Sequence, residues 1–134
     1  MTDRFPAVHG AYAEALIARF RSRDATVGVI GLGYVGLPLV CRFAEAGFRT
    51  IGFDSDPDKV AALKAARSYI ARVPGEKLSN ALKKGFAPTT EYARAAECDA
   101  WIICFPTPLT RAREPIVTRT SAVVPALMST SLGD

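Results

Sequence analysis

Three closely spaced glycines mark the part of the chain whose residue types are suited to holding a ligand. They lie in the segment Gly31-Leu32-Gly33-Tyr34-Val35-Gly36, which follows an apolar run and precedes a segment of helical periodicity. In such a pattern the first glycine permits a tight turn, the second lets a pyrophosphate approach the backbone, and the third lets the helix pack closely on the strand. Free N–H groups at the helix start favour an anion there. Alone, the spacing is weak evidence.

An acidic residue follows where a ribose would need it. Asp54 ends the next apolar run, at about the 20-residue offset typical of dinucleotide-binding units. Its carboxylate can accept hydrogen bonds from both hydroxyls of an adenosine ribose, and it would repel a 2′-phosphate. Neither Ser55 nor Asp56 offers a guanidinium group to receive such a phosphate. The sequence therefore predicts NAD, rather than NADP, as the ligand.

Two further polar residues lie near the expected site. Lys59 comes one turn into the next predicted helix, where it would flank the adenosine end of the cofactor, although a solvated lysine explains the spacing equally well. Thr107 follows the fourth predicted strand, at the edge of the sheet where ligands bind in open α/β folds. Its two proline neighbours are equally consistent with a rigid exit loop.

The cysteines and the histidine argue against other chemistries. The three cysteines, Cys41, Cys98 and Cys104, form no CxxC pair, and His9 is the only histidine. An odd count without a secretion signal argues against a disulfide framework, and no metal site is expected. Cys104 lies in an apolar strand without a nearby base, so we interpret it as a buried structural thiol and not as a nucleophile.

Alternating strands and helices must position these residues. Parallel pairing follows from this alternation, so we predict an α/β fold with a Rossmann-type, doubly wound parallel sheet, truncated after about four strands. A leading helix over residues 11–23 would cap the sheet or pack on a second subunit. The predicted strands are 27–30, 49–54, 86–89 and 100–105, and the predicted helices run from about 33 to 46, 56 to 66 and 76 to 84, with a helical turn at 90–97.

Charge and hydropathy restrict the classes of partner. The net charge is +4, but the basic residues are scattered, which favours solvated helix faces over a nucleic-acid surface. No apolar run reaches the ~18–20 residues of a membrane span. The first ten residues lack the apolar core of a signal peptide. We therefore expect a cytoplasmic protein that contacts neither nucleic acid nor membrane.

These motifs together resemble the amino-terminal part of the UDP-glucose/GDP-mannose dehydrogenase family. The resemblance covers residues 11–115 and is closest to the UDP-N-acetylglucosamine 6-dehydrogenase branch. The family blocks are Val29–Leu39, Gly52–Asp54 with Lys59, Glu97–Ala100 and Cys104–Leu109, and the branch blocks are Ser68–Ile70, Ala87–Thr90, Pro108–Thr110 and Arg113–Pro115.

The resemblance implies oxidation of the C6 alcohol of a UDP-N-acetylhexosamine to the uronate, with two NAD per turnover, for polysaccharide biosynthesis. It implies no catalytic residue in this chain. The family's cysteine lies far downstream in a glycine-preceded Cys-x-Pro segment, which Cys104-Phe105-Pro106 does not match in position. The cofactor contacts that it implies are Gly31, Leu32, Gly33, Tyr34, Val35, Gly36, Asp54, Lys59 and Thr107.

The domain boundaries follow from the same comparison. We predict an N-terminal helical extension over residues 1–25, a partial NAD-binding domain over 26–115, and an atypical, weakly structured tail rich in Ser and Thr over 116–134. The substrate domain and the nucleophile would lie outside this chain, so we expect it to be an incomplete enzyme. The alternative is a non-catalytic NAD-binding module that forms a homo-oligomer or pairs with a full-length dehydrogenase.

Overall fold

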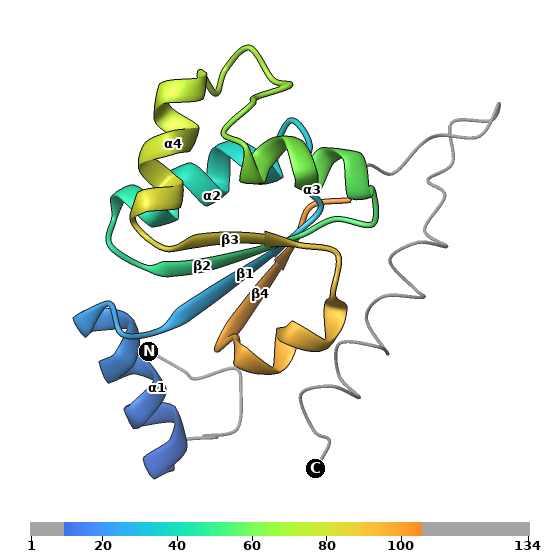
Figure 1. Cartoon of the computed structure of the whole chain (residues 1–134). Coiled ribbons are helices and arrows are strands. Elements are labelled where there is room, and N and C mark those ends of the chain that lie inside the picture. The colour runs from blue at the N-terminus through green and yellow to red at the C-terminus, as the bar shows by residue number, and fades with distance from the viewer. Residues whose placement is uncertain (1–9, 106–134) are drawn as a thin grey trace, which may run out of the picture.

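Four parallel strands form the centre of the protein. The computed structural model describes residues 10–105, and all statements of structure below concern these residues (Figure 1). The strands pair in the order β3-β2-β1-β4, and every pair is parallel, as the sequence predicts. Their bounds are β1 Thr26–Ile30, β2 Arg49–Phe53, β3 Phe86–Thr89 and β4 Ala100–Ile103.

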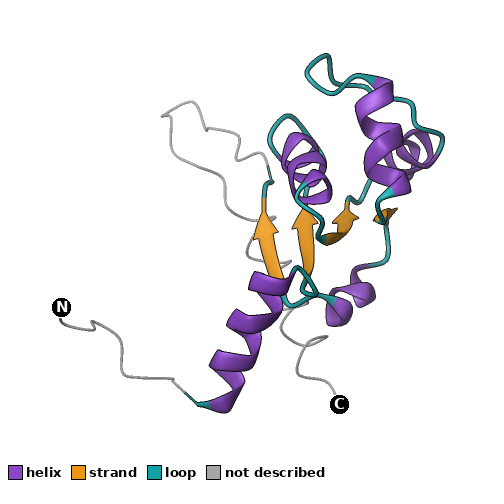
Figure 2. Ribbon diagram, turned by 90° about the vertical axis from the view of Figure 1, so that its left-hand side faces the viewer, coloured by secondary structure: helices purple, strands orange, loops and turns teal. Residues whose placement is uncertain are grey.

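The helices cover the two faces of this sheet unequally. Figure 1 shows α2, α3 and α4 gathered on one face, whereas the short 3-10 helix η1 lies on the other. Figure 2 shows the strands running in one direction, with α1 lying at their amino ends. The helices are α1 Ala11–Ser22, α2 Gly36–Glu45, α3 Pro57–Lys64, α4 Gly75–Lys83 and η1 Tyr92–Glu97.

Local signals set the ends of several helices. The Asp56 side chain caps α3 by accepting a hydrogen bond from the Asp58 N–H at 2.9 Å, and Pro57 takes the first helical position. Gly47 and Gly85 follow α2 and α4 with φ values of +97° and +107°. Glycine adopts this left-handed conformation without the steric penalty of a Cβ, so both helices end there. The carboxyl ends of α2 and α4 lie within one residue of the predicted ends.

The start of α2 differs from the prediction. The helix begins at Gly36, not near Gly33 or Tyr34, because the residues between Gly31 and Gly36 form the turn that follows β1. Val35 therefore precedes the first helical turn and is 63% exposed. The residues of α2 that are buried are Gly36, Leu37, Val40, Cys41 and Ala44.

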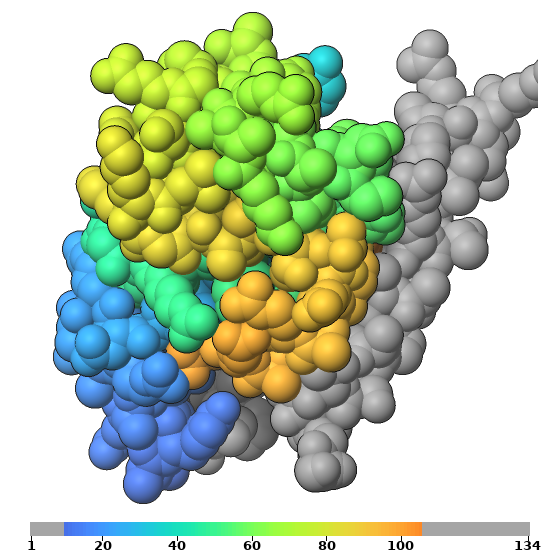
Figure 3. Space-filling view, viewed as in Figure 1, coloured from blue at the N-terminus to red at the C-terminus, as the bar shows by residue number. Residues whose placement is uncertain are grey.

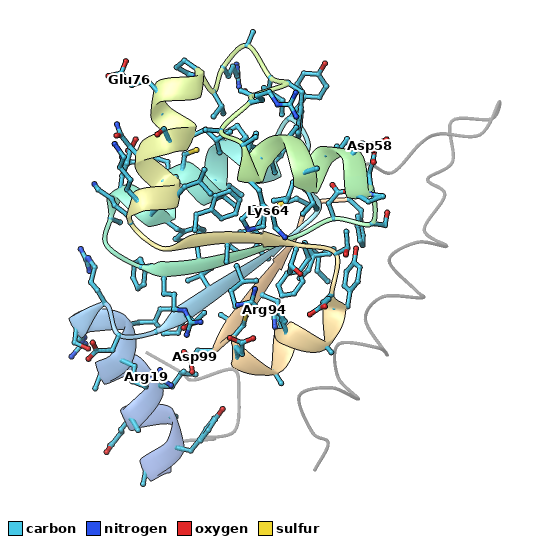
Figure 4. The ribbon with its side chains drawn as sticks, in the orientation of Figure 1. Arg19, Asp58, Lys64, Glu76, Arg94 and Asp99 are labelled. Atoms are coloured by element: carbon cyan, nitrogen blue, oxygen red, sulfur yellow. The ribbon has the colours of Figure 1, made fainter. Side chains whose placement is uncertain are left out.

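The leading helix α1 is attached to the domain by polar contacts and by Phe20, which packs against the main buried cluster. The Arg19 guanidinium donates to Asp99 Oδ1 at 2.6 Å, and Asp99 Oδ2 accepts the Thr26 N–H at 2.7 Å (Figure 4). None of its twelve residues is buried, and Tyr12 and Ile17 are 80% and 49% exposed. The helix therefore packs on the domain only in part. In the space-filling view α1 protrudes at one end of the molecule (Figure 3).

Candidate cofactor-binding site

A groove of about 620 Å³ lies at the carboxyl ends of the strands. It is lined by the glycine loop, by the end of β2 with the start of α3, by the loop after α3, and by the end of β4 with the residues that follow it. Seven of the nine predicted cofactor contacts line it, whereas Gly36 lies behind the loop and Thr107 lies outside the described residues. The lining residues are Gly31, Leu32, Gly33, Tyr34, Val35, Asp54, Ser55, Lys59, Tyr69, Ile70, Ile103, Cys104 and Phe105.

Two of the three loop glycines are required by the fold itself. Gly31 has a φ of +97°, and a Cβ on it would lie 2.8 Å from the carbonyl oxygen of Cys104. A Cβ on Gly36 would collide with the carbonyl oxygen of Gly31. These are the tight turn and the close helix–strand approach that the sequence pattern predicts.

Gly33 differs, because packing does not explain it. A Cβ there would find no atom of the described residues within 4 Å, and its φ is not in the left-handed region. Among the described residues, none accepts a hydrogen bond from the backbone N–H of Gly33, Tyr34 or Val35. These groups lie just before the start of α2, where the helix dipole is positive. Open space beside free donors fits a pyrophosphate.

Asp54 is held rigidly at the end of β2. The residue is 9% exposed, its Oδ2 accepts the Leu32 N–H at 3.0 Å, and its Oδ1 accepts the Asp56 N–H at 2.9 Å. Each carboxylate oxygen has capacity for a second hydrogen bond. The carboxylate is therefore oriented before a ligand arrives, with an acceptor left on each oxygen for a ribose hydroxyl.

Lys59 and Tyr69 line this end of the groove; the sequence analysis placed Tyr69 in the branch block Ser68–Ile70 but did not predict it as a site residue. The Lys59 ammonium lies 5.6 Å from the centroid of the Tyr69 ring, and the Tyr69 hydroxyl donates to the Leu32 carbonyl. Burial raises the pKa of Tyr69, and the nearby carboxylates of Asp54 and Asp56 raise it further. The Asp54 carboxylate lines this end of the groove and would repel a 2′-phosphate. No spacing rule marks Tyr69 in the sequence, because its contact spans 37 residues.

The opposite wall contains Ile103, Cys104 and Phe105. Cys104 is partly buried, and its backbone N–H donates to the Ile30 carbonyl at 2.7 Å. Burial raises the pKa of the Cys104 thiol, so the sulfur is protonated and weakly nucleophilic near neutral pH. Cys104 was predicted to be a buried structural thiol; the residue is only partly buried and lines the groove.

The described residues contain neither a candidate metal site nor a membrane-spanning helix. Between residues 10 and 105, no group of three or more His, Cys, Asp or Glu side chains is arranged to hold a metal ion. In the same part of the chain, no helix is both long enough and apolar enough to cross a membrane.

Comparison with known proteins identifies the family. The model of the NAD binding domain of the UDP-glucose/GDP-mannose dehydrogenase family matches residues 25–131. The chain belongs to this family. Its cofactor is accordingly NAD, for which the glycine loop and Asp54 provide a fitting site. The match extends beyond residue 115, so the boundary expected there stays a prediction.

Individual relatives agree with this assignment. A UDP-N-acetyl-D-glucosamine 6-dehydrogenase from Salmonella typhi is 33% identical over 95 residues, which are 71% of this chain and 22% of that protein. A UDP-N-acetyl-D-mannosamine dehydrogenase from Escherichia coli K12 is 36% identical over 97 residues, or 70% and 22% of the two chains. The chain thus spans about a fifth of the length of these curated relatives.

Solved structures show the same fold. A UDP-glucose dehydrogenase from Pyrobaculum islandicum superimposes with a TM-score of 0.73 at 30% identity, covering 79% of this chain and 25% of that one. A UDP-N-acetyl-mannosamine dehydrogenase from Staphylococcus aureus gives a TM-score of 0.70 at 24% identity, with 79% and 26% coverage. The second likeness is evidence for the fold alone.

Proposed function

We propose that these residues are the NAD-binding part of a dehydrogenase that oxidises the C6 alcohol of a UDP-N-acetylhexosamine to the uronate with two NAD. The observation that carries the proposal is the buried Asp54 carboxylate, oriented by two backbone N–H groups beside a loop whose own N–H groups are free. NAD supplies the hydride acceptor in such a reaction. The named activities of the two curated relatives support an N-acetylated sugar as the substrate.

Each predicted contact has a role in this proposal. The N–H groups of Gly33, Tyr34 and Val35 bind the pyrophosphate, and Asp54 accepts from the ribose hydroxyls. Gly31, Leu32 and Gly36 shape the loop that presents these groups. Lys59 flanks the adenosine, and Thr107 contacts the cofactor from the segment after β4.

The 134 residues alone would bind NAD without oxidising a sugar. The described cysteines support this, since burial raises the pKa of all three thiols and none is paired with a base. A second oxidation through a covalent intermediate needs an activated nucleophile. The proposal therefore places the sugar site and the nucleophile in residues that this chain does not contain.

Calorimetry of NAD binding tests the proposal. We expect saturable binding to the purified chain, and we expect Asp54→Ala to raise the Kd roughly 10- to 100-fold, since hydrogen bonds to a charged group are lost. Asp58→Ala is the matched control, because Asp58 is an exposed acid in the first turn of α3 (Figure 4) and does not line the groove. No binding by the unmutated chain, or equal Kd values for both variants, would overturn the proposal.

A second candidate function is a module that pairs with a full-length dehydrogenase or with another copy of itself. One observation favours it: among the described strands, β4 pairs only with β1, so its other edge has no described partner. Unpaired edges are templates for further strands. Co-purification of the tagged chain with such an enzyme would support this candidate. A monomer that binds neither a full-length dehydrogenase nor a second copy would argue against it.

Fractionation of cells would test the expected cytoplasmic location.

A further inference from the structure

Tyr69 lies in the loop between α3 and α4, and this loop is firmly anchored. Ser68 Oγ accepts the Ile70 N–H at 3.2 Å and lies 2.9 Å from the Ile70 carbonyl oxygen, to which it donates. The side chains of Ile70 and Val73 are buried in the core that α2 and α4 share with the sheet. The position of Tyr69 at the groove is therefore fixed by its neighbours on both sides.

The Tyr69 hydroxyl holds a backbone unit that also holds Asp54. The hydroxyl donates to the Leu32 carbonyl, while the N–H of the same Leu32 donates to Asp54 Oδ2 at 3.0 Å. The Leu32 carbonyl shares a rigid peptide plane with the Gly33 N–H. One hydroxyl thus fixes the backbone between the acceptor for the ribose and the donor for the pyrophosphate.

The Tyr69 ring adds a wall to this end of the groove. It is 37% exposed and lines the groove on one side, and the Lys59 ammonium lies 5.6 Å from its centroid. A cation over an aromatic face is favourable, so the ring and the ammonium hold each other in place. The hydroxyl also stays protonated throughout the physiological range, because burial and the carboxylates of Asp54 and Asp56 raise its pKa.

We propose that Tyr69 is a positioning residue for NAD, which acts by fixing the Leu32–Gly33 peptide between Asp54 and the free N–H groups of the glycine loop. The inference rests on the proposed NAD site and adds a residue to it from a different part of the chain. In the absence of the hydroxyl the loop would sample other peptide orientations, and NAD binding would have to restore the productive one.

Removal of the hydroxyl alone provides the test. In the full 134-residue chain, Tyr69→Phe should raise the Kd for NAD about fivefold, the effect of one net hydrogen bond. Tyr12→Phe is the matched control, because Tyr12 is 80% exposed on α1.

A double variant tests whether the two residues act together. In Tyr69→Phe/Asp54→Asn the Kd for NAD should rise by less than the product of the two single fold-increases, because the two residues act through one peptide. Additive effects would indicate a structural role only and overturn the proposal.

Amide hydrogen exchange in the absence of NAD tests the role of Tyr69 without relying on a binding measurement. Tyr69→Phe should accelerate exchange of the Leu32 N–H several-fold and leave the buried amides of β1 unchanged, whereas unchanged exchange at Leu32 would overturn the inference. If the unmutated chain binds no NAD, the proposed function fails whatever the exchange shows. If it binds NAD and Tyr69→Phe binds equally well, only the role of Tyr69 fails.

Discussion

The two faces of the sheet are built very differently. On the face under α2, α3 and α4, thirteen described residues form one buried cluster, to which Leu32 and Ile70 belong. On the opposite face only four described residues are buried together, namely Ile30, Ile51, Phe53 and Ala95, with Tyr92 and Trp101 partly covering them. We call these the thick face and the thin face.

The difference shows where the precision of the site originates. Leu32 and Ile70 are part of the thick-face core and also line the groove, so the packing of that core sets the groove's geometry. Of the described residues in the thin-face cluster and its partly buried neighbours, Phe105 alone lines the groove. Changes in the thick face next to the groove should therefore affect binding and stability together, whereas changes in the thin face should affect stability.

The largest effect is expected from Gly36→Ala. Its Cβ would collide with the Gly31 carbonyl oxygen, so α2 must move away from β1. We expect a loss of about 3 kcal/mol in the free energy of unfolding, at the upper end for overpacked sites, and loss of NAD binding. Urea denaturation and calorimetry measure the two.

Gly33→Ala is the matched control for that prediction. Its Cβ enters open space, so stability should change by less than about 0.5 kcal/mol, while the methyl group would occupy the approach of the pyrophosphate and weaken NAD binding. Equal stability losses for the two alanines would contradict the separate roles of the two glycines.

Truncation of one core side chain on each face compares the faces directly. Leu78, on α4, is fully buried in the thick face, and Leu78→Ala should lower the free energy of unfolding by about 3 kcal/mol. Tyr92 is partly buried in the thin face, where it stacks on Phe53 at a centroid distance of 5.8 Å. Tyr92→Ala should lower it by about 1.5 kcal/mol. Equal losses in urea denaturation would remove the energetic distinction between the faces.

The sequence predicted the features that local residue patterns determine. The roles of Gly31 and Gly36 were found because each glycine acts within a few residues of its own position. Gly28 and Gly52 gave no such signal. A Cβ on Gly28 would lie 2.9 Å from the Cys98 sulfur, and one on Gly52 would lie 2.7 Å from the Phe86 ring. Glycine is needed at these two positions because segments distant in the sequence come into contact there. The position of Tyr69 likewise depends on a long-range contact.

A pH dependence is expected from the thin face. The pKa of Cys98 is raised from its ordinary 9.0 to about 11. Burial is the largest cause, and the nearby charges of Glu97 and Asp99 raise the pKa further. Because the folded state binds this proton more tightly than the unfolded state, the contribution is complete below pH 9 and is lost as the pH rises towards 11. The urea midpoint should therefore fall less between pH 8.5 and 10.5 in Cys98→Ala than in the unmutated chain. An identical fall in both proteins would show that the thiol ionises without penalty.

The smallest effect is expected at α1, which belongs to neither face. The Arg19–Asp99 pair is half-exposed on the arginine side, and exposed pairs contribute at most about 1 kcal/mol. Arg19→Ala should therefore lower the free energy of unfolding by about 0.5 kcal/mol. Asp99→Ala should cost about 1 kcal/mol more, because the Thr26 N–H then loses its acceptor as well. Neither variant should alter NAD binding, since α1 lies at the amino ends of the strands and the groove at their carboxyl ends. A changed Kd for NAD in Arg19→Ala would mean that α1 communicates with the groove through β1 and β4, and that the geometry of the site depends on more than the thick face.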